Sequence, residues 1–226
     1  MATDFVADAV RRSTSKPVHK IPPPIDVTLS RPYQRSEFGL PADVYMFLFS
    51  FDFNSFAKRK NPEGAIAAFR QAFDLARRDG ALVVKTINGT IRPEKLSEMH
   101  DLVGGDARII LVDEFFSREQ VFGLQSVVDA FVSLHRSEGF GLGLAESMYL
   151  GKPVIGTAHS GNLEFIDRDN SCLGKTARGP GSETSSFRDT RWPESPCTAH
   201  QTQGKREWSI EHFKTRLTSG PATRAP

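Results

Sequence analysis

The chain has 226 residues, of which 38% are hydrophobic and 25% charged, and its formal net charge is +2. These values lie near the average for globular proteins and exclude a strongly polyanion-binding chain, so we expect no nucleic-acid partner. No apolar run approaches the roughly 20 residues of a membrane helix, and the N-terminal residues do not form a signal segment. We therefore expect a cytoplasmic protein, with peripheral attachment to the inner face of the membrane as the alternative.

The averages conceal two regions of different composition. Residues 1–173 carry 20 basic and 22 acidic side chains, whereas residues 174–226 carry 9 basic and 5 acidic ones. In the second region the branched aliphatic residues are Ile210 and Leu217 alone, among five glycines and five prolines. Such a composition cannot offset an ordering entropy of about 1–2 kcal/mol per residue. We predict a disordered tail over 174–226, which is either a natural flexible tail or the product of a reading frame altered near Leu173.

The first region alternates between helical and strand patterns. A short helix is predicted over 5–12, followed by a Pro-rich linker over 16–26. Asn61 is predicted to cap a helix that begins at Pro62 and continues to Ala76, where the apolar residues recur at helical spacing. Short apolar runs predict buried strands at 44–51, 81–86, 108–112, 129–134 and 152–155, and further helices are predicted at 92–103, 117–127, 143–150 and 160–166.

This alternation predicts an α/β fold with a doubly wound, Rossmann-like parallel sheet, covered by helices on both faces. Ligands of such sheets bind outside the carboxyl ends of the strands, where the strand order reverses. The loops that can carry chemistry therefore follow Phe51, Thr86, Val112, Leu134 and Ile155.

The loop after Leu134 combines glycines and carboxylates. Residues 135–143 read HRSEGFGLG and run into a predicted helix. Glycines let a backbone approach a ligand closely, and the first amides of a helix favour an anion such as phosphate. Glu138 and Glu146 stand eight residues apart and can accept hydrogen bonds from sugar hydroxyls. The loop therefore predicts a ligand with phosphate groups and two polyol parts.

Residues 131–162, FVSLHRSEGFGLGLAESMYLGKPVIGTAHSGN, resemble the donor-binding segment of the retaining glycosyltransferases of family 4, which have the GT-B fold. In that family a Glu-x7-Glu pair is followed by a helix, a Gly-Lys-Pro-Val-Ile strand and a Thr-x-x-Ser/Gly-Gly-Asn loop. Residues 49–73, FSFDFNSFAKRKNPEGAIAAFRQAF, look like the first strand, loop and helix of the same domain. The resemblance covers roughly residues 5–173. It implies transfer of a sugar from a nucleotide-diphosphate sugar to an acceptor, with retention of configuration.

The resemblance also implies roles for the charged residues. Glu138 hydrogen-bonds the donor sugar, Glu146 holds the ribose hydroxyls, and Lys60 neutralises the diphosphate. The arginine of the family stands about five residues before Lys60, where this chain has Ser55. Arg59 or Lys58 therefore takes its place, and we predict Glu138, Lys60 and Arg59 as the catalytic residues. A solvated basic loop is the alternative for the three cations.

Further donor contacts follow from the same resemblance. Backbone amides of the glycine loop meet the sugar and the phosphates, and the residues are Gly139, Phe140, Gly141 and Leu142. His135 and Arg136 can reach the donor or the acceptor, although His135 can equally be a packed loop histidine. Ser160, Gly161 and Asn162 are predicted to cap a helix and to aim amides at phosphate, an ordinary N-cap being the alternative.

No metal or other cofactor is expected. The sequence Asp167-Arg168-Asp169 follows a predicted helix and not a strand, and no His or Cys cluster has the spacing of metal ligands. The expected partners are the nucleotide-sugar donor and an unidentified glycan or other acceptor. The residues do not identify the base, the sugar or the acceptor.

The resemblance predicts three parts of the chain. Residues 1–40 look like the last helix and linker of an acceptor-binding domain that is missing here, and residues 41–173 form the nucleotide-sugar-binding domain, before the tail. Activity of the chain alone is therefore in question. A non-catalytic nucleotide-sugar-binding module is the first alternative, and an unrelated α/β domain is the second.

Overall fold

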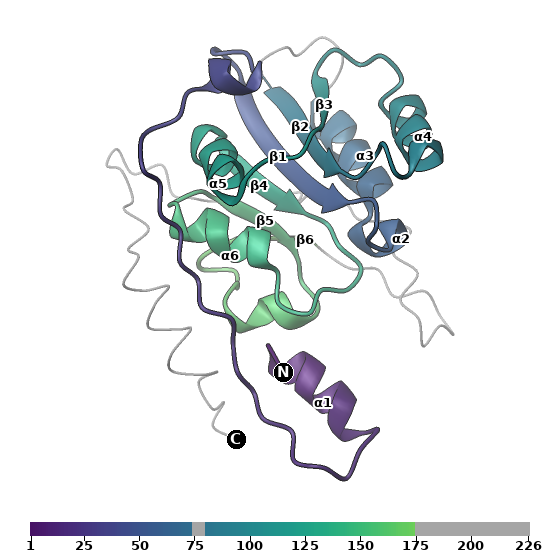
Figure 1. Ribbon diagram of the computed structural model, residues 1–226, viewed down its shortest axis with the longest axis vertical. Helices are drawn as coiled ribbons and strands as arrows, with labels where there is room; N and C mark the ends of the chain where they lie inside the picture. The colour runs from purple at the N-terminus through teal and green to yellow at the C-terminus, as the bar shows by residue number, and fades with distance from the viewer. Residues whose placement is uncertain (74–79, 175–226) are drawn as a thin grey trace.

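The computed structural model describes residues 1–73 and 80–174, and in these ranges it forms a six-stranded, all-parallel sheet (Figure 1). The strand order is β3-β2-β1-β4-β5-β6. The strands are β1 (Tyr45–Asp52), β2 (Gly80–Ile87), β3 (Ile109–Asp113), β4 (Ala130–Ser133), β5 (Val154–Thr157) and β6 (Cys172–Gly174). The predicted doubly wound sheet is confirmed, and the strand order reverses between β1 and β4.

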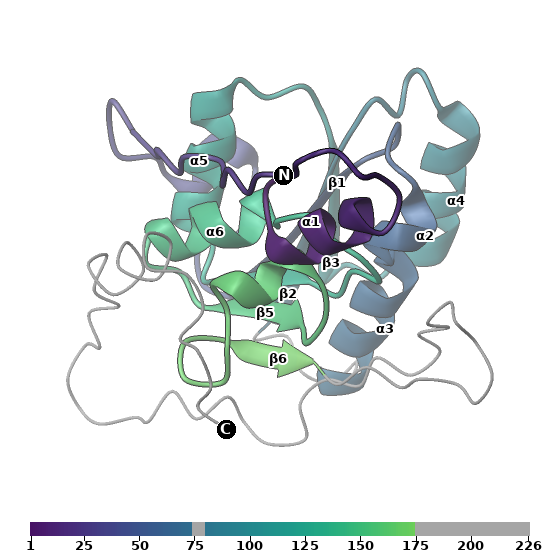
Figure 2. The same cartoon turned by 90° about the horizontal axis from the view of Figure 1, so that it is seen from below.

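Helices cover both faces of the sheet. Figure 2 shows α3 (Pro62–Ala72) and α4 (Pro93–Val103) on one side, and α5 (Arg118–Val127) and α6 (Leu142–Tyr149) on the other. Helices α4, α5 and α6 were predicted within one residue of these bounds, whereas α3 begins at the predicted Pro62 but ends at Ala72, four residues before the predicted end. Parallel strands need such crossover helices, because a short turn cannot return the chain to the same end of the sheet.

Strand β1 divides the core into two halves. Its side chains alternate, so Phe47, Phe49 and Phe51 pack with α3, while Met46 and Leu48 pack with α5 and α6. All five side chains are buried. A strand that is apolar on both faces is typical of a sheet covered on both sides, which is why the run 44–51 is continuously hydrophobic.

Several local predictions differ from the structure. Asn61 precedes α3 in the left-handed conformation, with φ 61°, and its side chain does not cap the helix. Its amide instead donates to the carbonyl oxygen of Leu134 at 2.8 Å. The segment predicted as a helix over 160–166 contains the 3₁₀ helix η2 (Gly161–Glu164). The predicted end of the helix at Ala76 lies outside the described residues.

Three short elements were not predicted. They are α2 (Ala57–Lys60), the 3₁₀ helix η1 (Arg35–Phe38) and β6. Each has three or four residues, which is too short for a hydrophobic period to show. The tail predicted over 174–226 lies outside the described residues apart from Gly174, which ends β6.

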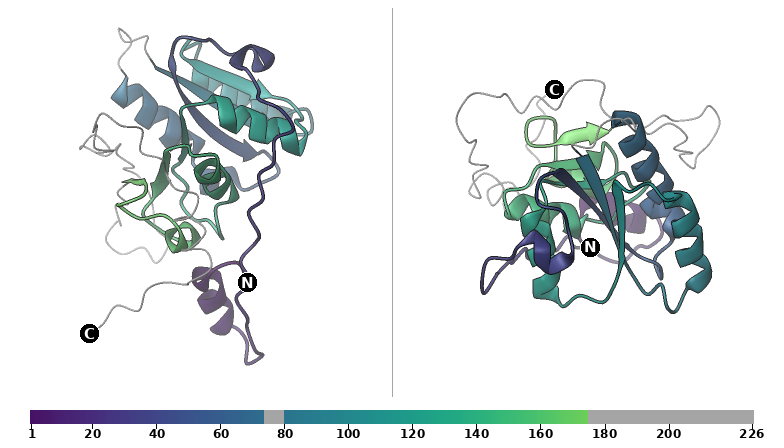
Figure 3. Two further views of the ribbon diagram at one scale, coloured as in Figure 1. Left: turned by 90° about the vertical axis from the view of Figure 1, so that its left-hand side faces the viewer. Right: turned by 90° about the horizontal axis from the view of Figure 1, so that it is seen from above.

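The N-terminal residues lie at the edge of the sheet where the strands end. Helix α1 (Asp4–Arg11) matches the predicted helix within one residue. Figures 1 and 3 show it apart from the main layers, joined to η1 by a long extended segment that includes the Pro-rich residues. Among the described residues, none of the helices has the length and apolar character needed to cross a membrane.

Candidate functional site

The candidate site lies at the carboxyl ends of β1 and β4, where the strand order reverses. The loop after β1 leads through α2 to Lys60, and the loop after β4 contains residues 134–141. The amide of Arg136 donates to the carbonyl oxygen of Arg59 at 2.8 Å, so the two loops are joined directly. The sheet therefore brings together the two sequence segments that carry the predicted site.

Glu138 is the centre of a cluster of charges. Its carboxylate lies 2.7 Å from Lys60 Nζ and 3.2 Å from Arg59 Nη1. Burial acts to raise the pKa of Glu138, but the hydrogen bond from Lys60 and the charges of Lys60 and Arg59 hold that pKa below its usual value. The cluster has two positive charges and one negative charge, so it keeps a positive excess.

Arg59 is held in this cluster by two further hydrogen bonds. Its guanidinium donates to the carbonyl oxygen of Ser137 at 3.0 Å and to Ser55 Oγ at 3.1 Å. Ser55 is the position at which the family resemblance predicts an arginine. The geometry brings Arg59, and not Lys58, onto Glu138. The described contacts include no ion pair of Lys58.

The N-terminus of α6 faces the same edge with free backbone amides. Gly141 precedes α6 with φ 97°, a conformation that favours glycine. Within the described residues, the amides of residues 140–144 have no hydrogen-bond acceptor. Free amides and the helix dipole attract anions, so this terminus and the charge cluster favour the same kind of ligand.

Glu146 lies one turn into α6 and is almost fully buried, with 4% of its side chain exposed. It forms an ion pair with Arg118, at the start of α5, and lies 3.5 Å from the side-chain nitrogen of Gln125. Burial raises the pKa of Glu146, although Arg118 and Gln125 counteract this rise. The two predicted glutamates therefore have different partners and opposite pKa shifts.

His135 is fully buried. Its ring nitrogens lie 2.9 Å from Ser133 Oγ and 3.0 Å from Asn162 Oδ1. Burial lowers the pKa of His135, so the neutral imidazole is favoured. Of the two alternatives weighed for His135, the burial fits a packed loop histidine.

Ser160 and Gly161 bond to the glycine loop. Ser160 Oγ accepts a hydrogen bond from the Glu138 amide at 2.9 Å, and the Gly161 amide donates to the Glu138 carbonyl oxygen at 2.9 Å. A Cβ atom at Gly161 would lie 2.1 Å from the carbonyl oxygen of Gly139, so no larger residue fits here. Neither the predicted side-chain cap by Ser160 nor a free Gly161 amide is therefore present.

The other predicted donor residues vary in exposure. Arg136 donates to Asn61 Oδ1 at 3.3 Å, while its buried Nε has no partner among the described residues. Phe140 is buried and packs on Phe165, with the ring centroids 5.0 Å apart. Leu142 is exposed at the start of α6. The Gly139 carbonyl oxygen accepts a hydrogen bond from Thr3 Oγ1 at 2.7 Å.

Several residues of the site were missed in the sequence. Arg118 and Gln125 contact Glu146, and Thr3 contacts the glycine loop. For Arg118 a signal existed, because it follows the loop after Val112, which is one of the five loops at the carboxyl ends. No signal links Thr3 to Gly139, which lies 136 residues away. In the described part of the chain, no group of three or more His, Cys, Asp or Glu residues is arranged to hold a metal ion.

The family model described as glycosyl transferases group 1 matches residues 31–173. This is more than half of the chain, so the chain belongs to that family. The comparison with curated proteins gives no match.

Solved structures share the GT-B-like fold. Sucrose-phosphate synthase from Thermosynechococcus elongatus is 21% identical, with a TM-score of 0.61 over 96% of this chain and 51% of that one. HepE from Anabaena, solved in complex with UDP and glucose, is 19% identical, with a TM-score of 0.51 over 67% of this chain and 38% of that one. A glycosyltransferase from Rickettsia africae is 17% identical, with a TM-score of 0.52 over 67% and 38%. The chain thus spans between about a third and a half of these three proteins.

Proposed function

We propose that the chain binds a nucleotide-diphosphate sugar at the carboxyl ends of β1 and β4, and that it serves transfer of the sugar to an acceptor with retention of configuration, as in family 4. One observation carries the proposal. Lys60 and Arg59 meet on Glu138 beside the free amides at the N-terminus of α6. Fixed positive charge and free amides converge where the diphosphate of a donor would lie.

The leaving group explains why this arrangement suits glycosyl transfer. As the bond between the anomeric carbon and the phosphate oxygen breaks, positive charge develops on the sugar and negative charge on the diphosphate. Lys60, Arg59 and the α6 amides stabilise the departing diphosphate because they are already oriented toward it. The proposal therefore does not require a metal ion or another cofactor.

The remaining polar residues supply binding and positioning in this proposal. Glu138 hydrogen-bonds the donor sugar while it holds both cations in place, and Glu146 accepts the ribose hydroxyls. His135 and Asn162 are positioning residues because both are fully buried and support the glycine loop through Ser160. The acceptor, a glycan or another hydroxyl compound, is held by a further domain. The protein carries out this function in the cytoplasm.

Thermal unfolding of the full chain with UDP, GDP and ADP tests donor binding. A ligand at about 100 times its Kd adds roughly 2.7 kcal/mol to the stability of the folded state. We expect one nucleotide to raise the midpoint in the native chain and in Lys58→Ala, and to have no effect in Lys60→Ala. If none of the three nucleotides shifts the midpoint of the native chain, the proposal is wrong.

Catalysis needs a separate test. NMR of the chain with the matching nucleotide-glucose detects glucose release, and the first anomer released reports retention or inversion. Release of the anomer present in the donor supports a retaining enzyme, and release of the opposite anomer contradicts it. Binding without release or transfer favours the non-catalytic nucleotide-sugar-binding module.

A further inference from the structure

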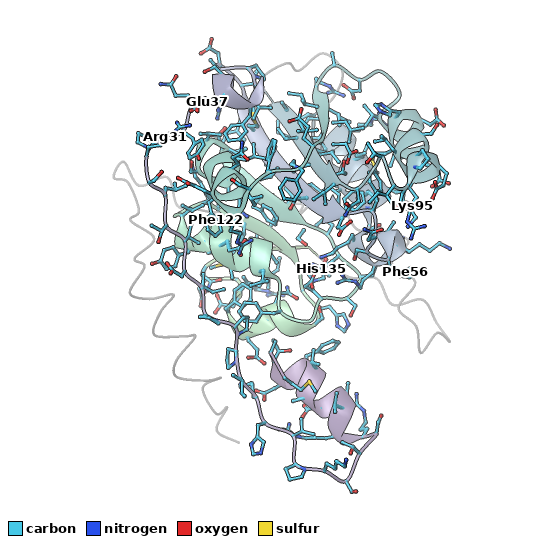
Figure 4. The ribbon with its side chains drawn as sticks, viewed as in Figure 1. Arg31, Glu37, Phe56, Lys95, Phe122 and His135 are labelled. Atoms are coloured by element: carbon cyan, nitrogen blue, oxygen red, sulfur yellow. The ribbon has the colours of Figure 1, made fainter. Side chains whose placement is uncertain are left out.

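The two side chains of the Arg118–Glu146 ion pair differ in their exposure to solvent. The Glu146 side chain is 4% exposed, whereas that of Arg118 is 60% exposed. Arg118 is the first residue of α5 and therefore lies at the same edge of the sheet as the charge cluster around Glu138. Its guanidinium stacks over the ring of Phe122, 4.5 Å from the centroid. Figure 4 shows Phe122 on α5, beside α6. Arg118 is thus the solvent-facing partner of a buried carboxylate.

Gln125 closes the opposite side of Glu146. It is one turn further along α5 than Phe122, is 2% exposed, and its side-chain nitrogen lies 3.5 Å from Glu146 Oε2. The carboxylate therefore lies between an interior amide and a surface guanidinium, and of these two partners Arg118 is the one that faces solvent. Strands β4 and β5 contain no charged residue, and among the described residues Arg118 is the charged group that interacts with Glu146.

We propose that Arg118 is a positioning residue for Glu146: it covers this carboxylate in the free chain, places a positive charge beside it, and yields one of its oxygens to the vicinal hydroxyl groups of a bound nucleoside. This inference rests on the proposed nucleotide-sugar site. A buried carboxylate without a cation would take up a proton, and a protonated acid accepts hydrogen bonds less well than the ion. A guanidinium on a flexible stem supplies the charge and can move along the Phe122 ring when hydroxyls arrive.

The test compares Arg118→Gln with Arg118→Lys and with Arg168→Gln, which removes an equally positive but unrelated exposed residue. The first measurement is the carbon-13 NMR titration of the Glu146 side chain, assigned with Glu146→Gln. We expect the midpoint to rise in Arg118→Gln, to rise less in Arg118→Lys, and to stay unchanged in Arg168→Gln. An unchanged midpoint in Arg118→Gln overturns the inference.

The second measurement is the affinity for the glucose conjugate of the nucleotide diphosphate that raises the unfolding midpoint, between about pH 5 and pH 8, because its two phosphates are diesters that do not titrate in this range. We expect Arg118→Gln to lose about tenfold in affinity near pH 6 and to recover most of it near pH 8. The affinity of Arg118→Lys should lie between that of the native chain and that of Arg118→Gln. Absence of binding by the native chain at every pH contradicts the proposed function. A native chain that binds, together with an Arg118→Gln chain that binds equally well at every pH, contradicts the role of Arg118 alone.

Discussion

The regions around Glu138 and Glu146 give the same side chain two opposite environments. Glu138 lies in a loop between Lys60 and Arg59, and these cations hold its pKa below the usual 4.5. Glu146 lies inside the α5–α6 layer with one exposed cation, and burial raises its pKa above 4.5. Around Glu138, Lys60 and Arg59 lower the pKa by more than burial raises it. Around Glu146, Arg118 lowers the pKa by less than burial raises it.

The difference separates two tasks that a nucleotide-sugar site must perform. The Glu138 region has excess positive charge and free amides, which suit the diphosphate and its developing charge. The Glu146 region has a buried carboxylate with one exposed cation beside it, which suits hydroxyls of a neutral ribose. Changes in the two regions should therefore affect binding in different ways.

The largest effect is expected for Lys60→Ala. Removing this cation leaves Glu138 with Arg59 alone and removes a contact to the diphosphate, so affinity for the matching nucleotide-diphosphate glucose should fall by about 2–4 kcal/mol. Isothermal titration calorimetry measures the loss, and Lys58→Ala is the matched control. An affinity loss that is equal in both variants would mean that the basic loop acts only through its net charge.

A smaller effect is expected for Glu146→Gln. The amide keeps the volume but has one acceptor oxygen and no charge, so nucleotide affinity should fall by about 1–2 kcal/mol. The loss should be similar for the matching nucleoside diphosphate and for its nucleoside, because it concerns the nucleoside. Glu98→Gln, on the exposed face of α4, is the control. A loss confined to the nucleoside diphosphate would instead link Glu146 to the phosphates and remove the contrast between the two glutamates.

His135 should make stability depend on pH. Its folded-state pKa lies below 6.5, so the unfolded chain takes up the proton more readily, and the free energy of unfolding should fall as the pH drops below about 6.5. Urea unfolding at several pH values should show this slope in the native chain and in His100→Gln. In His135→Gln the slope between about pH 6.5 and pH 5 should be shallower, with about 1–2 kcal/mol lost at neutral pH. An unchanged slope would show that His135 does not stay neutral.

The smallest effect is expected for Thr3→Val. The valine keeps the shape but can neither donate to the Gly139 carbonyl oxygen nor accept from the Val6 amide at the start of α1, so the free energy of unfolding should fall by about 1 kcal/mol. Affinity for the diphosphate should fall by less than the change in Lys60→Ala, because Thr3 acts only through the loop. Thr3→Ser retains the hydroxyl and should match the native chain in both measurements. A Thr3→Val chain that is as stable as the native one would show that α1 does not support the loop.

Sequence patterns were sufficient to predict the sheet, its helices and the edge at which the candidate site lies. Strands buried on both faces are continuous apolar runs, and helices are set by their 3.6-residue period and start residues, so β1 and α3 were predicted near their true bounds. The alternation of strands and helices places the loops after β1 and β4 at one edge of the sheet, and the family resemblance singled out Lys60 and Glu138, which lie in these loops.

The partners of these side chains could not be predicted from the sequence, because they depend on the three-dimensional packing. Arg118 reaches Glu146 across two helices, Thr3 reaches Gly139 from the N-terminal segment, and His135 turns inward onto Asn162. Asn61 does not form the expected side-chain cap. Its backbone is left-handed, and its side-chain amide donates to the carbonyl oxygen of Leu134. Local patterns fix backbone conformation over a few residues, whereas the direction and burial of a side chain depend on packing between segments far apart in the chain.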